Sequence, residues 1–299
     1  MLPLSPFVPF GSSFHWPFTG GCHYSDSCQA YITGCESCPV LNSSTVKDVS
    51  WRIFRRKKAA YKDLDDLTVI GLSQWLADLA KSSKLFKNKN VICLPNPINT
   101  QLFKPNDKKA SRELWNLPSD KKLILFGAMS ATSDKRKGFN ELLKALKHVN
   151  SSNVELIVFG SSRPKEDQNF GFKTHYLGQL YDKVSLISIY NSADVMITPS
   201  LQENLSNVVM ESLSCGTPVV GFNVGGNKDM INHKENGYLA ELANVKDLAE
   251  GIDWVLQHDN YNEICRNGRQ KIINSFESNL VAEKYLNLYQ NLKHNDNNQ

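Results

Sequence analysis

From about residue 120 onward, short apolar runs alternate with amphipathic segments along the chain. The apolar runs are rich in Val, Ile, Leu and Phe, which is typical of strands buried in a parallel sheet. The segments between them carry apolar residues three and four positions apart, which indicates helices. The pattern predicts strands over 121–128, 154–160, 174–178, 194–200 and 217–223 and helices over 139–149, 183–193, 206–215 and 245–257.

Strand and helix in alternation predict an α/β fold, in which a doubly wound parallel sheet binds its ligand at the carboxyl ends of its strands. A G-x-G-x-x-G sequence follows none of these strands, which argues against a dinucleotide site. Residues 276–292 form one more amphipathic segment and predict a helix, whereas the polar residues 293–299 predict a disordered tail.

The composition adds little beyond an ordinary globular protein. The 299 residues are enough for two domains with cores of their own. A net charge of +4 is too small and too dispersed to indicate a nucleic-acid partner. One basic run, Arg52–Lys58, lies in a plausible helix and favours a solvated or membrane-facing surface.

The sequence indicates neither a membrane span nor a signal peptide. No apolar stretch approaches the roughly 18 residues that are needed to cross a bilayer. Residues 1–18 are apolar, but they lack a basic start and are interrupted by proline. We therefore expect a cytoplasmic protein.

Four of the seven cysteines, Cys22, Cys28, Cys35 and Cys38, fall within one short segment. In a reducing compartment such a cluster indicates a metal site before it indicates a disulfide framework. The C-x2-C spacing of the last pair suits a structural zinc site of four thiolates, although the first pair is spaced more widely than in usual zinc ribbons. Two disulfides or redox-sensitive thiols, and unligated thiols, are the alternatives, and His23 is a candidate ligand in place of one cysteine.

Two acidic residues, Glu203 and Glu211, flank the start of the helix predicted after the strand 194–200. If that helix begins at Ser206 or Asn207, Glu203 lies on a loop at the carboxyl edge of the sheet and Glu211 lies about one turn into the helix. The free N–H groups at such a helix start bind anions readily. This arrangement suits a ligand with both hydroxyls and phosphates, and the alternative is a capped helix with an exposed acidic face.

The surrounding sequence resembles a known family. Residues 199–239 are similar, almost position for position, to the E-x7-E region of family 4 glycosyltransferases of the GT-B fold. Residues 133–146 resemble their phosphate-binding K-G-F segment, and residues 71–105 resemble their interdomain stretch. Residues 16–41 resemble the cysteine-bearing segment of a bacterial surface-polysaccharide subgroup. The resemblance extends from residue 16 to about residue 290.

The resemblance implies a role for each matching residue. Glu203 would hydrogen-bond hydroxyls of the donor sugar, and Glu211 would hold the ribose hydroxyls of the nucleotide. Lys137 would neutralise the diphosphate as it leaves, which makes Glu203 and Lys137 the catalytic residues. Such enzymes need no metal ion for catalysis, so any zinc here would be structural. The other donor-binding residues would be Arg136, Asn204, Leu205, Ser206, Asn207, Gly127, Gly225 and Gly226.

The resemblance also implies a domain organisation. Residues 1–100 would form a partial N-terminal acceptor domain that contains the cysteine cluster 22–38, and residues 101–275 a complete, Rossmann-like C-terminal donor domain. The helix over 276–292 would cross back to the N-terminal domain and dock against residues 45–85.

The chain departs from the family pattern in two places. Ala128 stands where many relatives carry Arg, so one diphosphate contact would be missing or would come from Lys135 or Arg136. Relatives of the subgroup read H-D-x-W-P-F-T-G-G, whereas this chain has Ser13 and Phe14 in place of His and Asp. The first fifteen residues do not resemble a strand, and the early strands of an acceptor domain are not recognisable. The chain therefore resembles a glycosyltransferase truncated at its N-terminus.

We therefore expect a retaining glycosyltransferase that transfers a sugar from a nucleotide-diphosphate sugar to a glycan or lipid-linked acceptor in surface-polysaccharide biosynthesis. It would work in the cytoplasm, with peripheral contact to the inner membrane face and without nucleic acid. The alternative is a truncated, non-catalytic chain that binds nucleotide sugar, or a subunit that depends on a separately encoded N-terminal half.

Overall fold

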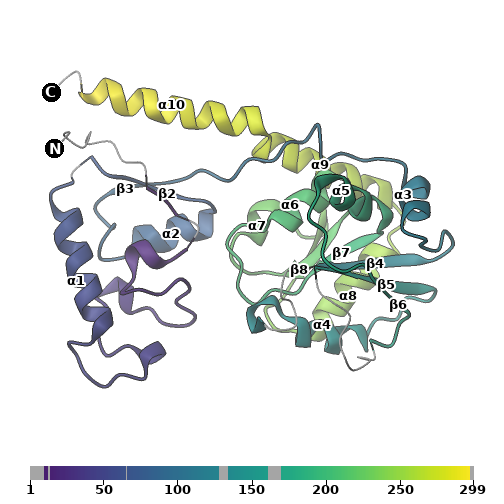
Figure 1. Ribbon diagram of the computed structural model, residues 1–299, viewed down its shortest axis with the longest axis horizontal. Helices are drawn as coiled ribbons and strands as arrows, with labels where there is room; N and C mark the ends of the chain where they lie inside the picture. Colours follow the sequence, from purple (N-terminus) through teal and green to yellow (C-terminus); the bar gives the residue numbers. More distant parts are fainter. Residues whose placement is uncertain (1–9, 13, 65, 128–133, 161–169, 297–299) are drawn as a thin grey trace. The chain divides into compact units, whose positions relative to one another are not determined.

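The computed structural model describes residues 10–12, 14–64, 66–127, 134–160 and 170–296. The chain divides into two compact units (Figure 1). The first, here called the N-terminal unit, comprises Met1–Asn96 together with Val281–Gln299, and the second, the C-terminal unit, comprises Pro97–Leu280. Each unit is built on a parallel sheet, which confirms the predicted α/β class.

The C-terminal unit contains a six-stranded parallel sheet in the order β6-β5-β4-β7-β8-β9. The chain adds strands outward on one side of β4 and then returns to the middle with β7. The strand order therefore reverses between β4 and β7, and the carboxyl ends of these strands open a crevice there. The strands are β4 (Lys122–Gly127), β5 (Val154–Phe159), β6 (Thr174–Tyr176), β7 (Val195–Thr198), β8 (Val219–Phe222) and β9 (Gly237–Ala240).

Helices cover both faces of this sheet, as the alternating pattern predicted. In Figure 1, α4 and α8 lie on one face, and α5 and α6 lie on the other. Several of these helices begin at a capping side chain: Asp182 accepts a hydrogen bond from the Ser185 amide, and Asn244 accepts one from the Asp247 amide. The elements are α3 (Lys108–Leu114), the short 3-10 helix η4 (Lys135–Lys137), α4 (Phe139–Leu146), α5 (Lys183–Ser192), α6 (Asn207–Ser214), α7 (Asn227–Met230), α8 (Val245–Leu256) and α9 (Tyr261–Phe276).

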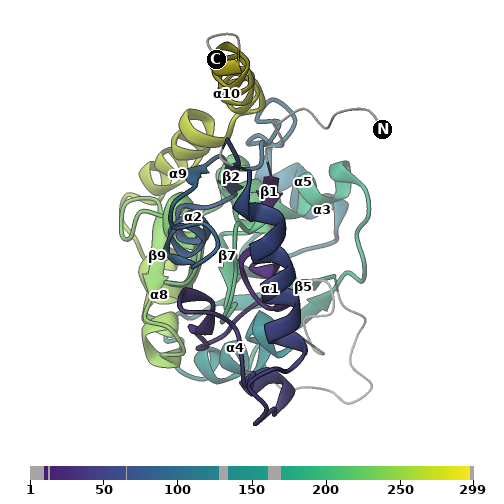
Figure 2. The same cartoon turned by 90° about the vertical axis from the view of Figure 1, so that its left-hand side faces the viewer.

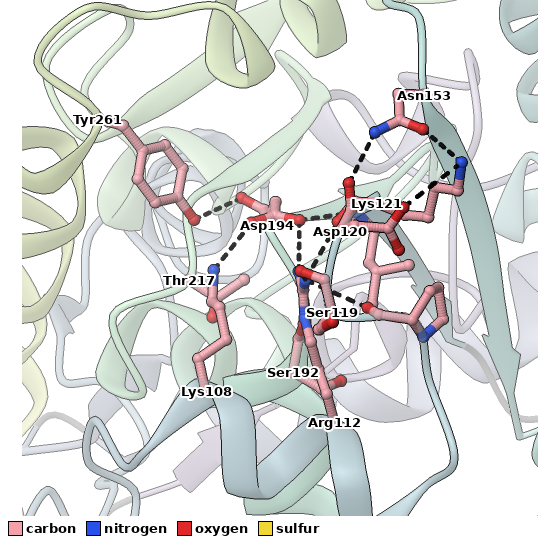
Figure 3. Close-up of polar contacts among 12 residues, drawn as sticks. Lys108, Arg112, Ser119, Asp120, Lys121, Asn153, Ser192, Asp194, Thr217 and Tyr261 are labelled. Atoms are coloured by element: carbon pink, nitrogen blue, oxygen red, sulfur yellow. Dashed lines mark hydrogen bonds and ion pairs between the residues drawn. The ribbon is translucent and has the colours of Figure 1, made fainter.

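A buried charge network fastens α3 to the amino edge of the sheet (Figure 3). Asp194, the residue before β7, accepts hydrogen bonds from Lys108 Nζ at 2.9 Å, from Arg112 Nη2 at 2.8 Å and from the Leu123 amide at 2.7 Å. The other Arg112 N–H groups donate to backbone carbonyls, among them that of Ser192. The buried carboxylate and guanidinium therefore satisfy each other, and the network has a structural role.

The N-terminal unit contains a three-stranded parallel sheet in the order β1-β2-β3. Figure 2 faces its long helix α1, drawn in dark blue. The expectation that the first fifteen residues form no strand was wrong, because Phe10–Ser12 pairs with Val69–Gly71. Such a short strand depends on backbone pairing, which leaves no alternation to read. The elements are β1 (Phe10–Ser12), η1 (Trp16–Phe18), η2 (Ala30–Ile32), η3 (Pro39–Leu41), α1 (Val49–Lys62), β2 (Thr68–Gly71), α2 (Gln74–Ser82) and β3 (Asn90–Cys93).

Lys57 is buried, although the basic run Arg52–Lys58 predicted a solvated or membrane-facing surface. Its side chain is buried and donates to the carbonyls of Trp16 and Thr19, and its ammonium lies 3.7 Å from the centroid of the Trp16 ring. Burial lowers the pKa of Lys57 to about 8. This lysine therefore fastens the segment that begins at Trp16 onto α1, while Arg52, Arg55 and Lys58 remain exposed.

The last helix, α10 (Ser278–Asp296), groups with the N-terminal unit from Val281 onward. Its Tyr285 hydroxyl donates to the Leu94 carbonyl, which lies outside the range 45–85 named for its docking site. The helix also continues through residues 293–296, where a disordered tail was expected, since no Pro or Gly interrupts the chain there. Residues 297–299 lie outside the described residues. No helix in the described part of the chain is long and apolar enough to cross a membrane.

Candidate active site

A cavity of about 470 Å³ opens at the carboxyl edge of the C-terminal sheet, where the strand order reverses. It is lined by the ends of β4 and β7, by the loop that follows β7 and by the first turn of α6. Sites of this size hold small ligands, and the reversal of strand order is where open α/β sheets bind them. Of the predicted site residues, the lining includes Gly127, Lys137, Glu203, Leu205, Ser206 and Asn207.

Gly138 brings the lysine to this cavity. Its φ of +67° is in the left-handed region, and a Cβ there would lie 1.7 Å from the Pro199 carbonyl oxygen, so only glycine fits. The Leu201 amide also donates to the Arg136 carbonyl at 2.7 Å. The turn before α4 therefore packs directly on the loop after β7, and this contact explains why Lys137 precedes a glycine.

Lys137 and Glu203 form an ion pair within the cavity, with 2.9 Å between Lys137 Nζ and Glu203 Oε2. The lysine side chain is 32% exposed and the glutamate side chain 12% exposed, so that a ligand can reach the pair. Ser200 Oγ donates to the same carboxylate oxygen at 3.5 Å. A lysine ammonium beside a carboxylate can bind an anionic group and hydroxyl groups at neighbouring points.

The start of α6 forms another wall of the cavity. Ser206 is its N-cap residue and makes no side-chain cap hydrogen bond, and the first turn of the helix contains no acidic residue. The first amides of a helix have no acceptor within it, and the positive end of the helix dipole lies there. Together with Lys137, this wall gives the cavity the character of an anion site.

Glu211 is not among the residues that line the cavity. It lies one turn beyond Asn207 and Val208, and its Oε2 accepts a hydrogen bond from the Tyr190 hydroxyl at 2.8 Å. Burial raises the pKa of Glu211, although the Tyr190 hydrogen bond and the Lys183 charge oppose that rise. The cavity lining therefore contains Glu203 but not Glu211, although the resemblance gives both a role in donor binding.

The other predicted donor-binding residues are not among those that line the cavity. Arg136 is exposed and holds Asp134 through two hydrogen bonds, and the Arg136 side chain lowers the pKa of that carboxyl. Asn204 is buried. The Gly226 amide donates to the Glu203 carbonyl, which ties the loop with Gly225 and Gly226 to the glutamate. Ala128 lies outside the described residues.

Three residues that build this site were not predicted as site residues: Pro199, Ser200 and Tyr190. Pro199 and Ser200 contact Gly138 and Glu203, and Tyr190 contacts Glu211. Tyr190 reads only as one apolar position of a predicted helix. Pro199 and Ser200 end the predicted strand 194–200, and this place at the carboxyl edge of the sheet was the one available signal.

The cysteine cluster does not fit the zinc site that its spacing suggested. Cys22, Cys28, Cys35 and Cys38 are free thiols, and among the described residues no three His, Cys, Asp or Glu side chains are grouped so as to hold a metal ion. Burial and the neighbouring thiols raise the pKa of Cys22, and burial raises that of Cys35 to about 11. Cys35 Sγ accepts the Gly20 amide at 3.1 Å. The raised pKa values of Cys22 and Cys35 disfavour the thiolate form that metal ligation needs.

Comparison with known proteins places these features in context. The family model described as "Glycosyl transferases group 1" matches residues 107–272. The chain is 27% identical to an uncharacterized glycosyltransferase of Methanocaldococcus jannaschii, over 94% of this chain and 69% of that protein. It is 27% identical to the capsular polysaccharide biosynthesis glycosyltransferase CapM of Staphylococcus aureus, over 74% of this chain and 60% of CapM.

A solved structure of Anabaena HepE in complex with UDP-glucose has the same fold. It aligns with a TM-score of 0.64 at 16% identity, over 80% of this chain and 68% of that chain. The predicted GT-B-like fold is confirmed by this likeness. The chain thus spans 60% of CapM and 68% of the HepE chain.

Proposed function

Because the chain belongs to the group 1 glycosyltransferases, we propose that it transfers a sugar from a nucleotide-diphosphate sugar to a hydroxyl of a glycan or lipid-linked acceptor. The observation that carries this proposal is that the Lys137–Glu203 ion pair and the start of α6 line one cavity at the reversal of strand order. The name of CapM supports a polysaccharide product, and the UDP-glucose in the HepE structure supports the donor class.

The diphosphate would lie between Lys137 and the first turn of α6. As the bond to the sugar breaks, negative charge grows on the diphosphate, and the Lys137 ammonium and the α6 amides would stabilise it. The backbone turn that carries Lys137 is held against the loop after β7, because Gly138 packs against the Pro199 carbonyl. We propose that the Lys137 ammonium and the α6 amides supply the positive charge that the step needs, so that the reaction requires no metal ion.

Glu203 would bind hydroxyls of the transferred sugar. In the structure its carboxylate is paired with Lys137, and a diphosphate that attracts the lysine would release the carboxylate to accept hydroxyl donors. Glu211 would accept the ribose hydroxyls. Retention of the anomeric configuration follows from the resemblance to family 4, and the anomeric proton coupling of the product tests it.

Calorimetric titration with UDP, GDP and ADP tests the donor site. We expect one of these nucleotides to bind, and Lys137→Ala to weaken its binding about tenfold or more through loss of a charge-assisted contact. Lys144→Ala is the matched control, because Lys144 is an exposed lysine of α4 that does not line the cavity. Absence of binding to all three nucleotides, or equal losses in the two variants, would refute the proposed site.

Transfer by this chain is a separate proposal, because the chain spans only 60% of CapM. We propose that the chain binds donor and transfers slowly by itself, since much of the rate depends on positioning the acceptor against the anomeric carbon. A radiolabelled-sugar assay on a membrane or glycan extract compares this chain with the chain plus a separately encoded N-terminal half. Equal rates in the two would exclude the partner-dependent alternative.

We also propose a cytoplasmic protein that attaches to an anionic membrane through α1. Arg52, Arg55, Arg56 and Lys58 are exposed on this helix, which contains no acidic residue. Four apolar side chains just before and at its start are more than half exposed: Val40, Leu41, Val46 and Val49. Basic residues beside exposed apolar ones are typical of a membrane-surface segment.

Sedimentation with vesicles tests this attachment. We expect binding to phosphatidylglycerol vesicles, weaker binding to phosphatidylcholine, and loss of binding when Arg52, Arg55 and Arg56 are changed to Gln. A control chain with Lys109, Lys246 and Arg266 changed to Gln has the same net charge, and it should bind as the wild type does. If both triple variants lose binding equally, net charge and not α1 is responsible.

A further inference from the structure

We propose that Tyr190 is a positioning residue, whose hydroxyl orients the Glu211 carboxylate and thereby sets the affinity of the site for the ribose of the donor nucleotide. The inference rests on the proposed function, in which Glu211 accepts the ribose hydroxyls. Tyr190 comes from α5 and would itself touch no ligand.

Tyr190 is held rigidly. Its side chain is fully buried, and the Phe159 ring packs edge-on against it with 6.1 Å between the ring centroids. Its backbone carbonyl accepts the Thr217 hydroxyl at 2.7 Å. A buried tyrosine with these contacts has little rotamer freedom, so its hydroxyl stays in one position beside α6.

The Tyr190 hydroxyl restricts the side-chain conformation of Glu211. The Tyr190 hydroxyl donates to Glu211 Oε2 at 2.8 Å, and a ligand hydroxyl would then be accepted by Oε1. Asn207 and Val208 line the cavity, and Glu211 follows them by four and three residues on the same helix, so the three share one face. Without the tyrosine, the glutamate would have to lose side-chain entropy on binding each ligand.

The charge state of Glu211 also depends on this hydrogen bond. The titratable groups that act on Glu211 are Tyr190 and Lys183 from α5. Burial, and after it the Glu211 charge, raises the pKa of Cys215, the residue after α6, and Arg269 of α9 opposes that rise. Burial raises the pKa of Glu211, and the Tyr190 hydrogen bond opposes that rise. An ionised carboxylate accepts hydroxyl donors best, so affinity is lost as the pH falls through this pKa. Removal of the Tyr190 hydroxyl should therefore shift that loss to higher pH.

A second buried tyrosine of the same unit provides the matched control. The Tyr238 hydroxyl donates to Asp247 Oδ1 at 2.7 Å, so Tyr238→Phe also removes a tyrosine–carboxylate hydrogen bond. Neither Tyr238 nor Asp247 lines the cavity. A purely structural role of Tyr190 would make the two Tyr→Phe variants behave alike.

The experiment measures nucleotide affinity by calorimetry from mildly acidic to neutral pH. The probe is whichever of UDP, GDP and ADP the wild-type chain binds most tightly, together with its 2′,3′-dideoxy analogue. The proteins are the wild type, Tyr190→Phe, Tyr238→Phe, Glu211→Ala and the double variant Tyr190→Phe/Glu211→Ala. Thermal unfolding of each protein reports any loss of fold.

We expect Tyr190→Phe to weaken ribonucleotide binding about tenfold and to lose it at a higher pH than the wild type, with little change for the dideoxy analogue. The double variant should bind no more weakly than Glu211→Ala, because the tyrosine acts through the glutamate. Equal losses for the two probes, or an unchanged pH profile, would overturn the inference while leaving the donor site intact. A wild type that binds none of the nucleotides would refute the proposed function itself.

Discussion

Each edge of the C-terminal sheet contains a carboxylate that is paired with basic side chains. The two arrangements differ in whether a ligand can reach the pair. At the amino edge, Asp194 accepts three hydrogen bonds and its partner Arg112 is 7% exposed (Figure 3). At the carboxyl edge, Glu203 is paired with Lys137, which is 32% exposed, and both line a cavity. The ion pair at the amino edge (the closed edge) is inaccessible to a ligand, whereas the ion pair at the carboxyl edge (the open edge) is accessible.

This difference separates a structural ion pair from a functional one. Arg112 directs its donors to fixed carbonyls and to Asp194, so its charge cannot be redirected without cost. Lys137 is 32% exposed and lines the cavity, so it can exchange its carboxylate for a phosphate at less cost. Burial and the number of partners therefore distinguish the two pairs better than the ion-pair distances, 2.8 Å and 2.9 Å.

The largest expected effect is at the closed edge. Asp194→Asn should lower the free energy of unfolding by about 3–5 kcal/mol, because it leaves the buried Arg112 without its carboxylate. Chemical denaturation measures this loss. Asp120→Asn is the control, since Asp120 is 73% exposed and pairs only loosely with Lys121, at 3.9 Å. Similar losses in both variants would show that the closed network contributes no more than a surface pair.

Gly138→Ala should cost somewhat less, about 2–4 kcal/mol of unfolding free energy, and should also weaken nucleotide binding. The cost combines a left-handed backbone with a clash against the Pro199 carbonyl. Gly178→Ala is the control, because it places alanine in a left-handed backbone (φ +68°) where a Cβ meets nothing within 4 Å. If the two variants unfold at the same denaturant concentration, the clash with Pro199 contributes nothing to the loss of stability at Gly138.

At the open edge, Glu203→Gln should barely change stability, by about 0–1 kcal/mol, because the cation that it leaves without a carboxylate, Lys137, is 32% exposed. The free nucleoside diphosphate should bind as well or slightly better, since Lys137 is released from its carboxylate. The nucleotide sugar should bind about tenfold more weakly, because the sugar hydroxyls lose a charged acceptor. Calorimetry with both ligands checks this split, which fails if the free diphosphate is affected as strongly as the sugar.

The smallest effect concerns the exposed pair beside the cavity. Arg136 holds the pKa of Asp134 below its usual value, so the pair contributes stability above the unfolded pKa near 3.8 and loses it as the pH falls through the lowered folded pKa. With Arg136 46% exposed, the contribution at neutral pH should stay below about 1 kcal/mol. Denaturation of Asp134→Asn and wild type should show a small difference at neutral pH that disappears in acid. A difference that persists in acid would not come from this ionisation.

The sequence alone determined most of the C-terminal sheet. Five of its strands, β4 to β8, lie within the predicted ranges, because apolar runs between amphipathic helices report burial directly. The strand β9 (Gly237–Ala240) and the helix α9 (Tyr261–Phe276) were not predicted, since neither has a clear apolar period of its own. The short strand β1 was missed because it depends on its partner β2.

The sequence likewise determined which residue types the site contains, and tertiary structure decided which of them meet. Lys137 and Glu203 are 66 residues apart and pair only because Gly138 admits the Pro199 carbonyl. Tyr190 reaches Glu211 only because α5 packs beside α6. The spacing of the cysteines along the chain likewise does not determine whether their thiols come close enough together to hold a metal ion. Periodicity and spacing are local properties, whereas these contacts depend on how distant segments cross, which no single segment encodes.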